Sequence, residues 1–131
     1  MPIQLYIPSE IEAAKAAHTA AFEKAVSQRD KFGENSPQFP ALQAIVDERF
    51  LEWYGPRVSF GQGDSPLFEA LGLRDLMNAK GLICVTKLKD ILRYVIAAYR
   101  PRSKRLKEKK EEVREMVTRA ILAKQPIYLS I

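Results

Sequence analysis

The sequence predicts a mainly helical α+β fold, in which about five helices pack with a small sheet formed by the N- and C-terminal strands. Apolar residues alternate with polar ones at both ends of the chain, and they recur at helical spacing between the ends. Proline, glycine and capping residues divide the helical part. The chain has 131 residues, close to the commonest domain size, and no change of composition marks a boundary. We therefore predict a single domain over residues 1–131.

Strands are predicted at the two ends. Aliphatic side chains occupy alternate positions at Ile3, Leu5 and Ile7, and again at Ile127, Leu129 and Ile131. Successive side chains of a strand point to opposite faces, so each segment has one aliphatic face. Two strands alone are only marginally stable, so the sheet needs a third strand or a covering helix. Residues 82–85, Leu-Ile-Cys-Val, are the candidate third strand, and their apolar character on both faces predicts a central position.

Two helices are predicted in the first half. The first begins at Pro8 with Ser9 as its N-cap and ends near Gly33, and the second runs from Pro40 to Gly55. The apolar stripe of the first helix is Ile11, Ala14, His18, Phe22, Ala25 and Phe32, and that of the second is Leu42, Ile45, Val46, Phe50 and Trp53. We expect the second stripe to be buried.

A glycine-rich loop over residues 55–64 is predicted to follow, with a short extended piece at residues 58–60. The third helix is predicted to begin at Asp64-Ser65-Pro66, with proline at its first position. Gly72 should bend or split this helix, and Gly81 should end it.

Two more helices complete the expected fold. Thr86 is the predicted cap of the fourth, which should end at Pro101, and Ser103 is the predicted cap of the fifth. Their apolar stripes are Leu88, Ile91, Leu92, Val95, Ile96 and Tyr99, and then Leu106, Val113, Val117, Ala120 and Ile121.

The second half of the chain is cationic. Residues 1–64 hold 6 Lys and Arg against 9 Asp and Glu, whereas residues 65–131 hold 15 against 7. Between Arg74 and Lys110 there are 12 basic residues and 3 acidic ones. This asymmetry indicates an anionic partner, although a dipolar surface that only favours solubility accounts for it as well.

The sequence indicates no membrane segment. The longest apolar runs, such as residues 82–85, are far shorter than the about 18 residues that a span needs, and no basic and apolar leader stands at the N-terminus. The single cysteine, Cys84, excludes an intrachain disulfide and fits a reducing compartment. We predict a cytoplasmic protein without membrane contact.

No catalytic signature is found, and we predict that the protein is not an enzyme. His18 is the single histidine, and the nearby carboxylates are Glu10, Glu12 and Glu23. We interpret His18 as structural, because spacing alone supplies no second ligand or orienting group. Cys84 lies in an apolar run, so we expect it to be buried and inert.

Two other motifs have ordinary interpretations. Glu48 and Glu52 lie one helical turn apart beside Asp47, a geometry that could hold a divalent cation, but Arg49 between them favours a solvated acidic face. The stretch Gly61-Gln62-Gly63-Asp64 is glycine-rich like a phosphate loop but lacks its lysine, so we predict an ordinary loop. We expect neither a metal nor a cofactor.

Residues 73–96 could form a helix-turn-helix with Gly81 in the turn and residues 88–91 on the recognition helix. Residues 82–86 make that connection too long and too apolar for a tight turn, so we do not favour it. If the connecting residues form a strand, a variant resembling a winged helix stays open.

The strongest functional signal is the basic segment 100–107, at the start of the fifth helix. Cations there oppose the partial positive charge of a helix N-terminus, at a cost of about 0.3–1 kcal/mol each. A local rule broken repeatedly hints at function, and free N–H groups beside cations make a phosphate site. Pairs such as Lys104–Glu108 and Lys107–Glu111 equally fit a helix that is merely well solvated.

We predict a small, non-catalytic regulatory or accessory protein that binds nucleic-acid backbone, DNA or RNA, through its basic half. The predicted contact residues are Lys87, Lys89, Arg93, Tyr94, Arg100, Arg102, Lys104, Arg105, Lys107, Lys109 and Lys110. The alternative is a protein–protein interaction module or inhibitor that docks an acidic surface of a larger protein complex. The sequence does not give the oligomeric state.

Overall fold

The computed structural model describes residues 3–131, and it confirms a mainly helical α+β fold with a small antiparallel sheet. The chain forms two compact units. We call residues 9–56 the hairpin unit, and residues 3–8 with 57–131 the sheet unit. Along the chain, the hairpin unit is therefore inserted between two parts of the sheet unit. Whether both belong to the single predicted domain stays a prediction.

The sheet has four strands in the order β2-β1-β4-β3: β1 (Ile3–Tyr6), β2 (Val58–Phe60), β3 (Leu82–Ile83) and β4 (Ile127–Ser130). All neighbouring strands are antiparallel, and Leu5 lies opposite Leu129. The prediction that the terminal segments share one sheet is confirmed, and so is the extended piece at residues 58–60.

The predicted central strand over residues 82–85 is corrected by the structure. Strand β3 contains only two residues and lies at the edge of the sheet, beside β4. Cys84 is exposed and Val85 begins a helix, so the expectation of a buried cysteine is wrong. An apolar run of four residues fits a strand passing into a helix as well as a central strand, and periodicity cannot distinguish them.

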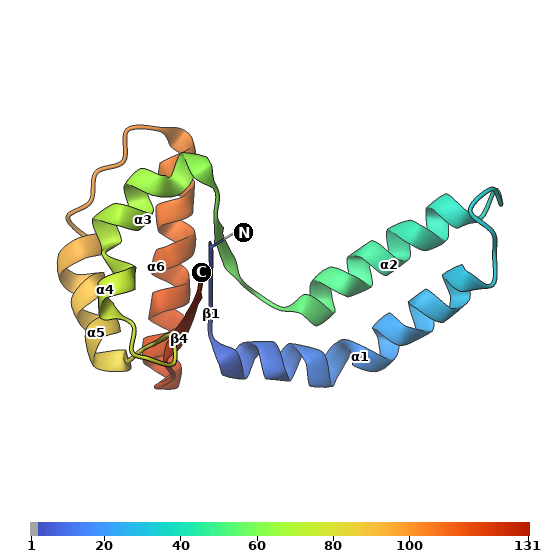
Figure 1. Ribbon diagram of the computed structural model, residues 1–131, viewed down its shortest axis with the longest axis horizontal. Helices are drawn as coiled ribbons and strands as arrows, with labels where there is room; N and C mark the ends of the chain where they lie inside the picture. Colours follow the sequence, from blue (N-terminus) through green and yellow to red (C-terminus); the bar gives the residue numbers. More distant parts are fainter. Residues whose placement is uncertain (1–2) are drawn as a thin grey trace. The chain divides into compact units, whose positions relative to one another are not determined.

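One face of the sheet forms the core with the helices of the same unit (Figure 1). The side chains on this face are Leu5, Val58, Phe60, Ile83, Ile127 and Leu129, all buried. The other face is more polar, and it carries Tyr6 and Tyr128 opposite each other, with ring centroids 5.1 Å apart.

Short helices follow β2. A 3₁₀ turn, η1 (Gln62–Asp64), leads into α3 (Ser65–Leu71), and α4 (Leu73–Leu76) comes next. Gly72 separates them with a left-handed backbone at φ 61°, which confirms the predicted split. The helix-turn-helix over residues 73–96, which the sequence does not favour, is indeed not formed, since α4 has four residues and β3 lies between it and the next helix.

The fourth predicted helix is α5 (Val85–Asp90) followed without a break by a π-helical segment, η2 (Ile91–Ile96). It ends several residues before Pro101. Ile91 and Ile96 are five residues apart and each is 1% exposed. Residues five apart diverge around an α-helix but come into line in a π turn, where hydrogen bonds join them. The wider turn therefore keeps both isoleucines in the core.

The fifth predicted helix is α6 (Lys104–Ala123), and its cap is confirmed. The Ser103 hydroxyl accepts a hydrogen bond of 3.1 Å from the Leu106 N–H. Its core face is Val113, Met116, Val117 and Ala120, all at most 1% exposed.

The hairpin unit consists of α1 (Pro8–Asp30) and α2 (Phe39–Tyr54). Its aromatic side chains pack together, with Phe22 and Trp53 stacked at 5.4 Å between centroids. The expected burial of the α2 stripe is confirmed only at Val46, because Ile45 is 42% and Phe50 is 39% exposed. Two helices alone have too few facing side chains to cover both sides of the stripe. Over residues 3–131, no helix combines the length and apolar character needed to cross a bilayer.

Candidate anion-binding face

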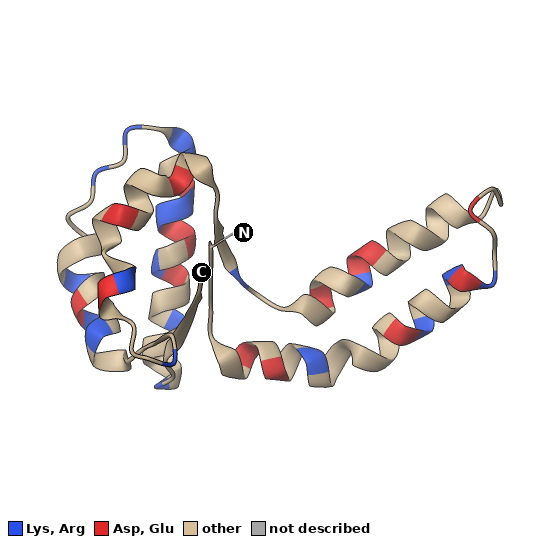
Figure 2. Ribbon diagram, viewed as in Figure 1, with Lys and Arg blue, Asp and Glu red and all other residues tan. Residues whose placement is uncertain are grey.

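The predicted basic segment forms the connection between η2 and α6 and the first turns of α6. Figure 2 shows Lys and Arg along this stretch, with Asp and Glu following further along α6. Arg102, Lys104 and Lys107 are exposed here. The Ser103 hydroxyl satisfies one N–H group at the start of α6. The exposed cations therefore lie beside a capped helix N-terminus.

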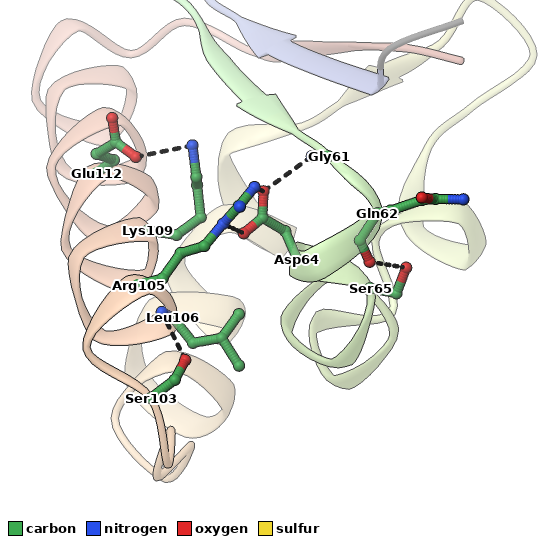
Figure 3. A network of polar contacts seen from close by, with 9 residues as sticks. All are labelled: Gly61, Gln62, Asp64, Ser65, Ser103, Arg105, Leu106, Lys109 and Glu112. Carbon is green, nitrogen blue, oxygen red and sulfur yellow. Dashed lines mark hydrogen bonds and ion pairs between the residues drawn. The ribbon is translucent and has the colours of Figure 1, made fainter.

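Arg105 forms an ion pair with Asp64, a partner that the sequence did not suggest. Its Nε donates to Asp64 Oδ1 over 3.1 Å, and its Nη2 donates to Oδ2 over 3.4 Å (Figure 3). The Asp64 side chain is 1% exposed, whereas that of Arg105 is 65% exposed. Asp64 is thus a buried carboxylate whose charge is balanced by a cation lying over it, which joins η1 to α6.

The glycines around Asp64 make room for this contact. A Cβ atom at Gly61 would lie 3.2 Å from Arg105 Nη2, and one at Gly63 would lie 3.4 Å from Arg105 Cζ. The Gly61 N–H also donates to Asp64 Oδ2 over 2.8 Å. The glycine-rich stretch therefore lies close against the Arg105 guanidinium, and its Gly61 N–H binds the carboxylate, a contact that the interpretation as an ordinary loop missed.

The pKa of Asp64 reflects opposing effects. Burial would raise the pKa of this carboxyl, but the hydrogen bonds from Arg105 and from the Gly61 N–H, with the charges of Arg105 and Lys109, lower it below its ordinary value. The same contact raises the pKa of Arg105. Asp64 is therefore ionised at neutral pH and compensates the charge of Arg105.

Two further predicted cations are paired with carboxylates of their own helix. Lys109 Nζ lies 3.1 Å from Glu112 Oε2, and the Lys109 side chain is 18% exposed. Lys104 Nζ lies 3.9 Å from Glu108 Oε1 on a fully solvated part of α6, a contact that contributes little.

Three predicted cations bind carbonyl oxygens near the ends of helices. Lys87 Nζ donates to the Leu76 carbonyl over 3.1 Å, Arg100 donates to Ala97 over 2.9 Å, and Lys110 Nζ donates to Tyr99 over 2.8 Å. Cations are favourable at helix C-termini, because the last carbonyls there lack partners. These three side chains have a structural role, yet a carbonyl does not neutralise them.

The remaining predicted residues are Lys89, Arg93, Tyr94, Arg102 and Lys107. Arg93 lies over the Tyr94 ring at 5.3 Å from its centroid. Within residues 3–131, Lys89, Arg102 and Lys107 form neither an ion pair nor a side-chain hydrogen bond, and all three are exposed. These cations are therefore free to meet an external anion.

The histidine and the acidic cluster lie in the hairpin unit. His18 Nδ1 is 3.7 Å from Glu52 Oε2, and the Glu52 carboxylate also accepts hydrogen bonds of 3.0 and 3.1 Å from Arg49. The carboxylate beside His18 thus comes from α2, whereas the sequence drew attention to neighbours on α1. No group of three or more metal-ligating side chains converges in the described part of the chain.

Comparison with protein-family models, with curated proteins and with solved structures finds no match to this chain.

Proposed function

We propose that this protein is a non-catalytic regulatory or accessory protein that binds the phosphate backbone of nucleic acid through its sheet unit. The observation that supports this most is a group of exposed cations in the basic part of the sheet unit that have no carboxylate partner in the described chain: Lys89, Arg93, Arg102 and Lys107. Of these, Arg102 and Lys107 lie at or within the first turns of α6, where the helix dipole disfavours cations. An anionic partner would give them a favourable interaction.

The proposed chemistry is charge neutralisation. Each Lys or Arg that meets a phosphate releases condensed counterions, so affinity falls as salt rises. Such contacts position the strand and carry little sequence information. Three further basic side chains are bound to carbonyl oxygens and not to carboxylates, so they would add to the positive electrostatic potential of this surface: Lys87, Arg100 and Lys110. A cytoplasmic location belongs to the same proposal.

The test compares two variants that lose the same charge. In Arg102→Gln/Lys107→Gln, the two removed cations belong to the proposed face. In Lys24→Gln/Lys31→Gln, they are exposed cations of the hairpin unit. Binding of a labelled duplex is measured by fluorescence anisotropy over a series of salt concentrations.

We expect the first variant to flatten the slope of log affinity against log salt by about 0.9 for each lost phosphate contact, and the second to leave the slope close to that of the parent. Equal losses in both variants would mean that only the net charge matters. A parent that binds neither single strands nor duplexes would overturn the proposal.

The second candidate function is a protein–protein interaction module or inhibitor. Two features favour it. The exposed cations Arg102 and Lys107 suit an acidic protein surface as well as phosphate. Four apolar residues of the hairpin unit, Phe32, Ile45, Phe50 and Leu51, expose 39–69% of their surface. A parent that binds no nucleic acid, but binds an acidic polypeptide such as polyglutamate in a way that requires Arg102 and Lys107, would favour this function.

A further inference from the structure

Tyr94 is the exposed aromatic side chain of the sheet unit. It is 61% exposed, whereas Phe60 and Phe68 are buried and Tyr6, Tyr99 and Tyr128 are half-buried. Among the described residues its ring contacts the guanidinium of Arg93, and its hydroxyl has no hydrogen bond. An exposed apolar ring stacked with a cation is available to a planar ligand.

The Tyr94 ring has basic residues near it along the chain. Tyr94 and Arg93 both lie in η2, which spans Ile91–Ile96. Lys89 is five residues before Tyr94 and four before Arg93. Lys89 lies in the last turn of α5, and residues four apart lie on the same side of a helix, so Lys89 and Arg93 share a side. Lys89, Arg93 and Tyr94 are all exposed, while Leu88, Ile91 and Ile96 on the opposite side are buried.

The segment also continues directly into the basic connection that leads to α6. Arg100 is tied to the Ala97 carbonyl at the end of η2, and Lys110 is tied to the Tyr99 carbonyl. These bonds tie the connection to the end of η2 and to α6, and Arg102 follows Arg100 by two residues. Asp90 is the one acidic residue on α5 and η2. The aromatic ring and the free cations are therefore parts of one predominantly basic stretch.

We propose that this face takes single-stranded nucleic acid, with Tyr94 stacking on a base while Lys89, Arg93 and Arg102 contact the flanking phosphates. The inference rests on the proposed function and narrows its ligand class. Bases of a duplex are stacked on one another, so an aromatic ring reaches a base face only in an unpaired strand. Proteins that bind single strands combine a basic groove with such stacking side chains.

The experiment measures anisotropy with a labelled 12-nucleotide single strand, as DNA and as RNA, with the matching duplex and with a strand of the same length that lacks its bases. The parent is compared with Tyr94→Ala and Tyr94→Phe. Leu122→Ala is the control, because Leu122 is a 78% exposed apolar residue of the same unit. Circular dichroism verifies that each variant is folded.

We expect Tyr94→Ala to bind the single strand about 5- to 100-fold more weakly and Tyr94→Phe to bind it as the parent does, because stacking needs the ring and not the hydroxyl. The base-free strand should bind the parent and Tyr94→Ala equally. The DNA and RNA arms show which strand is preferred, and the duplex should be insensitive to Tyr94.

Two results separate the inference from the proposed function. If Tyr94→Ala binds the normal strand like the parent while Arg102→Gln/Lys107→Gln weakens binding, the stacking role is wrong and backbone binding stands. If the parent binds no nucleic acid in any arm, both proposals fail.

Discussion

Asp64 is the one buried charged residue among those that the structure describes. It is buried, it accepts from the Gly61 N–H and from Arg105, and it links η1 to α6. Removing a partner from such a buried group leaves the others without compensation. The residue is therefore structural, although it contacts a side chain that the sequence assigned to binding.

Asp64→Asn should lower stability at pH 7 and remove an acid-sensitive component. The folded-state pKa of Asp64 is lowered, so the carboxylate stabilises the fold above its unfolded pKa of about 3.9. This stabilisation is lost as the pH falls through the lower folded value. We expect a loss of about 1–3 kcal/mol at pH 7, towards the lower end because Arg105 is exposed.

Urea unfolding between pH 2 and 7 measures this effect. The difference in stability between parent and Asp64→Asn should shrink as the pH falls below 4. Asp75→Asn, which alters an exposed carboxylate of the same unit, is the control. A constant difference across the range would contradict the assigned pKa direction.

Replacing Arg105 and replacing Arg102 by glutamine should have different effects on stability and on binding. Arg105→Gln removes the partner of Asp64 and should lower the melting temperature. Arg102→Gln removes an exposed cation with no partner in the described chain and should leave it unchanged, while weakening nucleic-acid binding. Differential scanning fluorimetry and anisotropy on both variants provide the comparison. An unaltered melting temperature in Arg105→Gln would show that the pair is dispensable.

At the scale of elements, the start of α6 combines a capping hydroxyl with basic first turns. The cap is the favourable contact there, since the cations oppose the helix dipole. Stability and binding therefore make opposite demands on the same few residues. This conflict can be measured at Ser103.

Ser103→Ala should destabilise the protein by about 0.5–2 kcal/mol, because the Leu106 N–H loses its acceptor. Ser103→Asp should keep the cap and stabilise the helix start through its charge. It should also weaken binding of nucleic acid by placing a negative charge at the proposed face. Denaturant unfolding and anisotropy distinguish the two effects. Stronger binding by the aspartate variant would contradict the location of the face.

Elements specified by local chemistry could be predicted from the sequence. Alternation gave the strands at residues 3–7 and 127–131, Ser103 gave the start of α6, and Gly72 gave the break after α3. These features depend on neighbouring residues only. The π turn of η2 could not be predicted from the sequence. Ile91 and Ile96 both belong to the apolar set of an ordinary helix, and only the packed core shows that both are buried.

The candidate site was predictable in composition but not in detail. All eleven predicted residues belong to the sheet unit. The partner of Arg105, however, lies 41 positions earlier in the chain. A contact of that separation leaves no local pattern. The Gly-x-Gly-Asp stretch was the available signal, since glycines flanking an acid indicate a close approach of another group.

At the scale of the whole molecule, the hairpin unit is an insertion between paired strands. Residues 9–56 lie between β1 and β2, which are antiparallel neighbours with Leu5 opposite Val58. Antiparallel neighbours need only a short loop to connect them. The core residues of the sheet unit all lie outside the insertion. The sheet unit therefore contains everything its own core requires.

Replacing residues 9–56 by Asn-Gly should leave a sheet unit that folds. The remaining connection from β1 to β2 is about five residues, within the usual range for hairpin loops. Cooperative thermal unfolding and retained single-strand binding are the expected outcomes. An excised peptide of residues 9–56 should be far less stable, because Ile11, Ala25 and Val46 are its buried residues in the structure. An unfolded sheet unit would show that the hairpin supports it.

The pairing of β1 with β4 sets an order of events during synthesis. Strand β1 leaves the ribosome before the other described elements, and its central partner β4 follows all of them. Helices α1 and α2 are neighbours in the chain and can meet while translation continues, whereas the sheet cannot close until β4 has emerged. Until then β1 presents an unpaired edge, with Leu5 uncovered. A nascent chain stalled before Ile127 is consequently the form most in need of a chaperone.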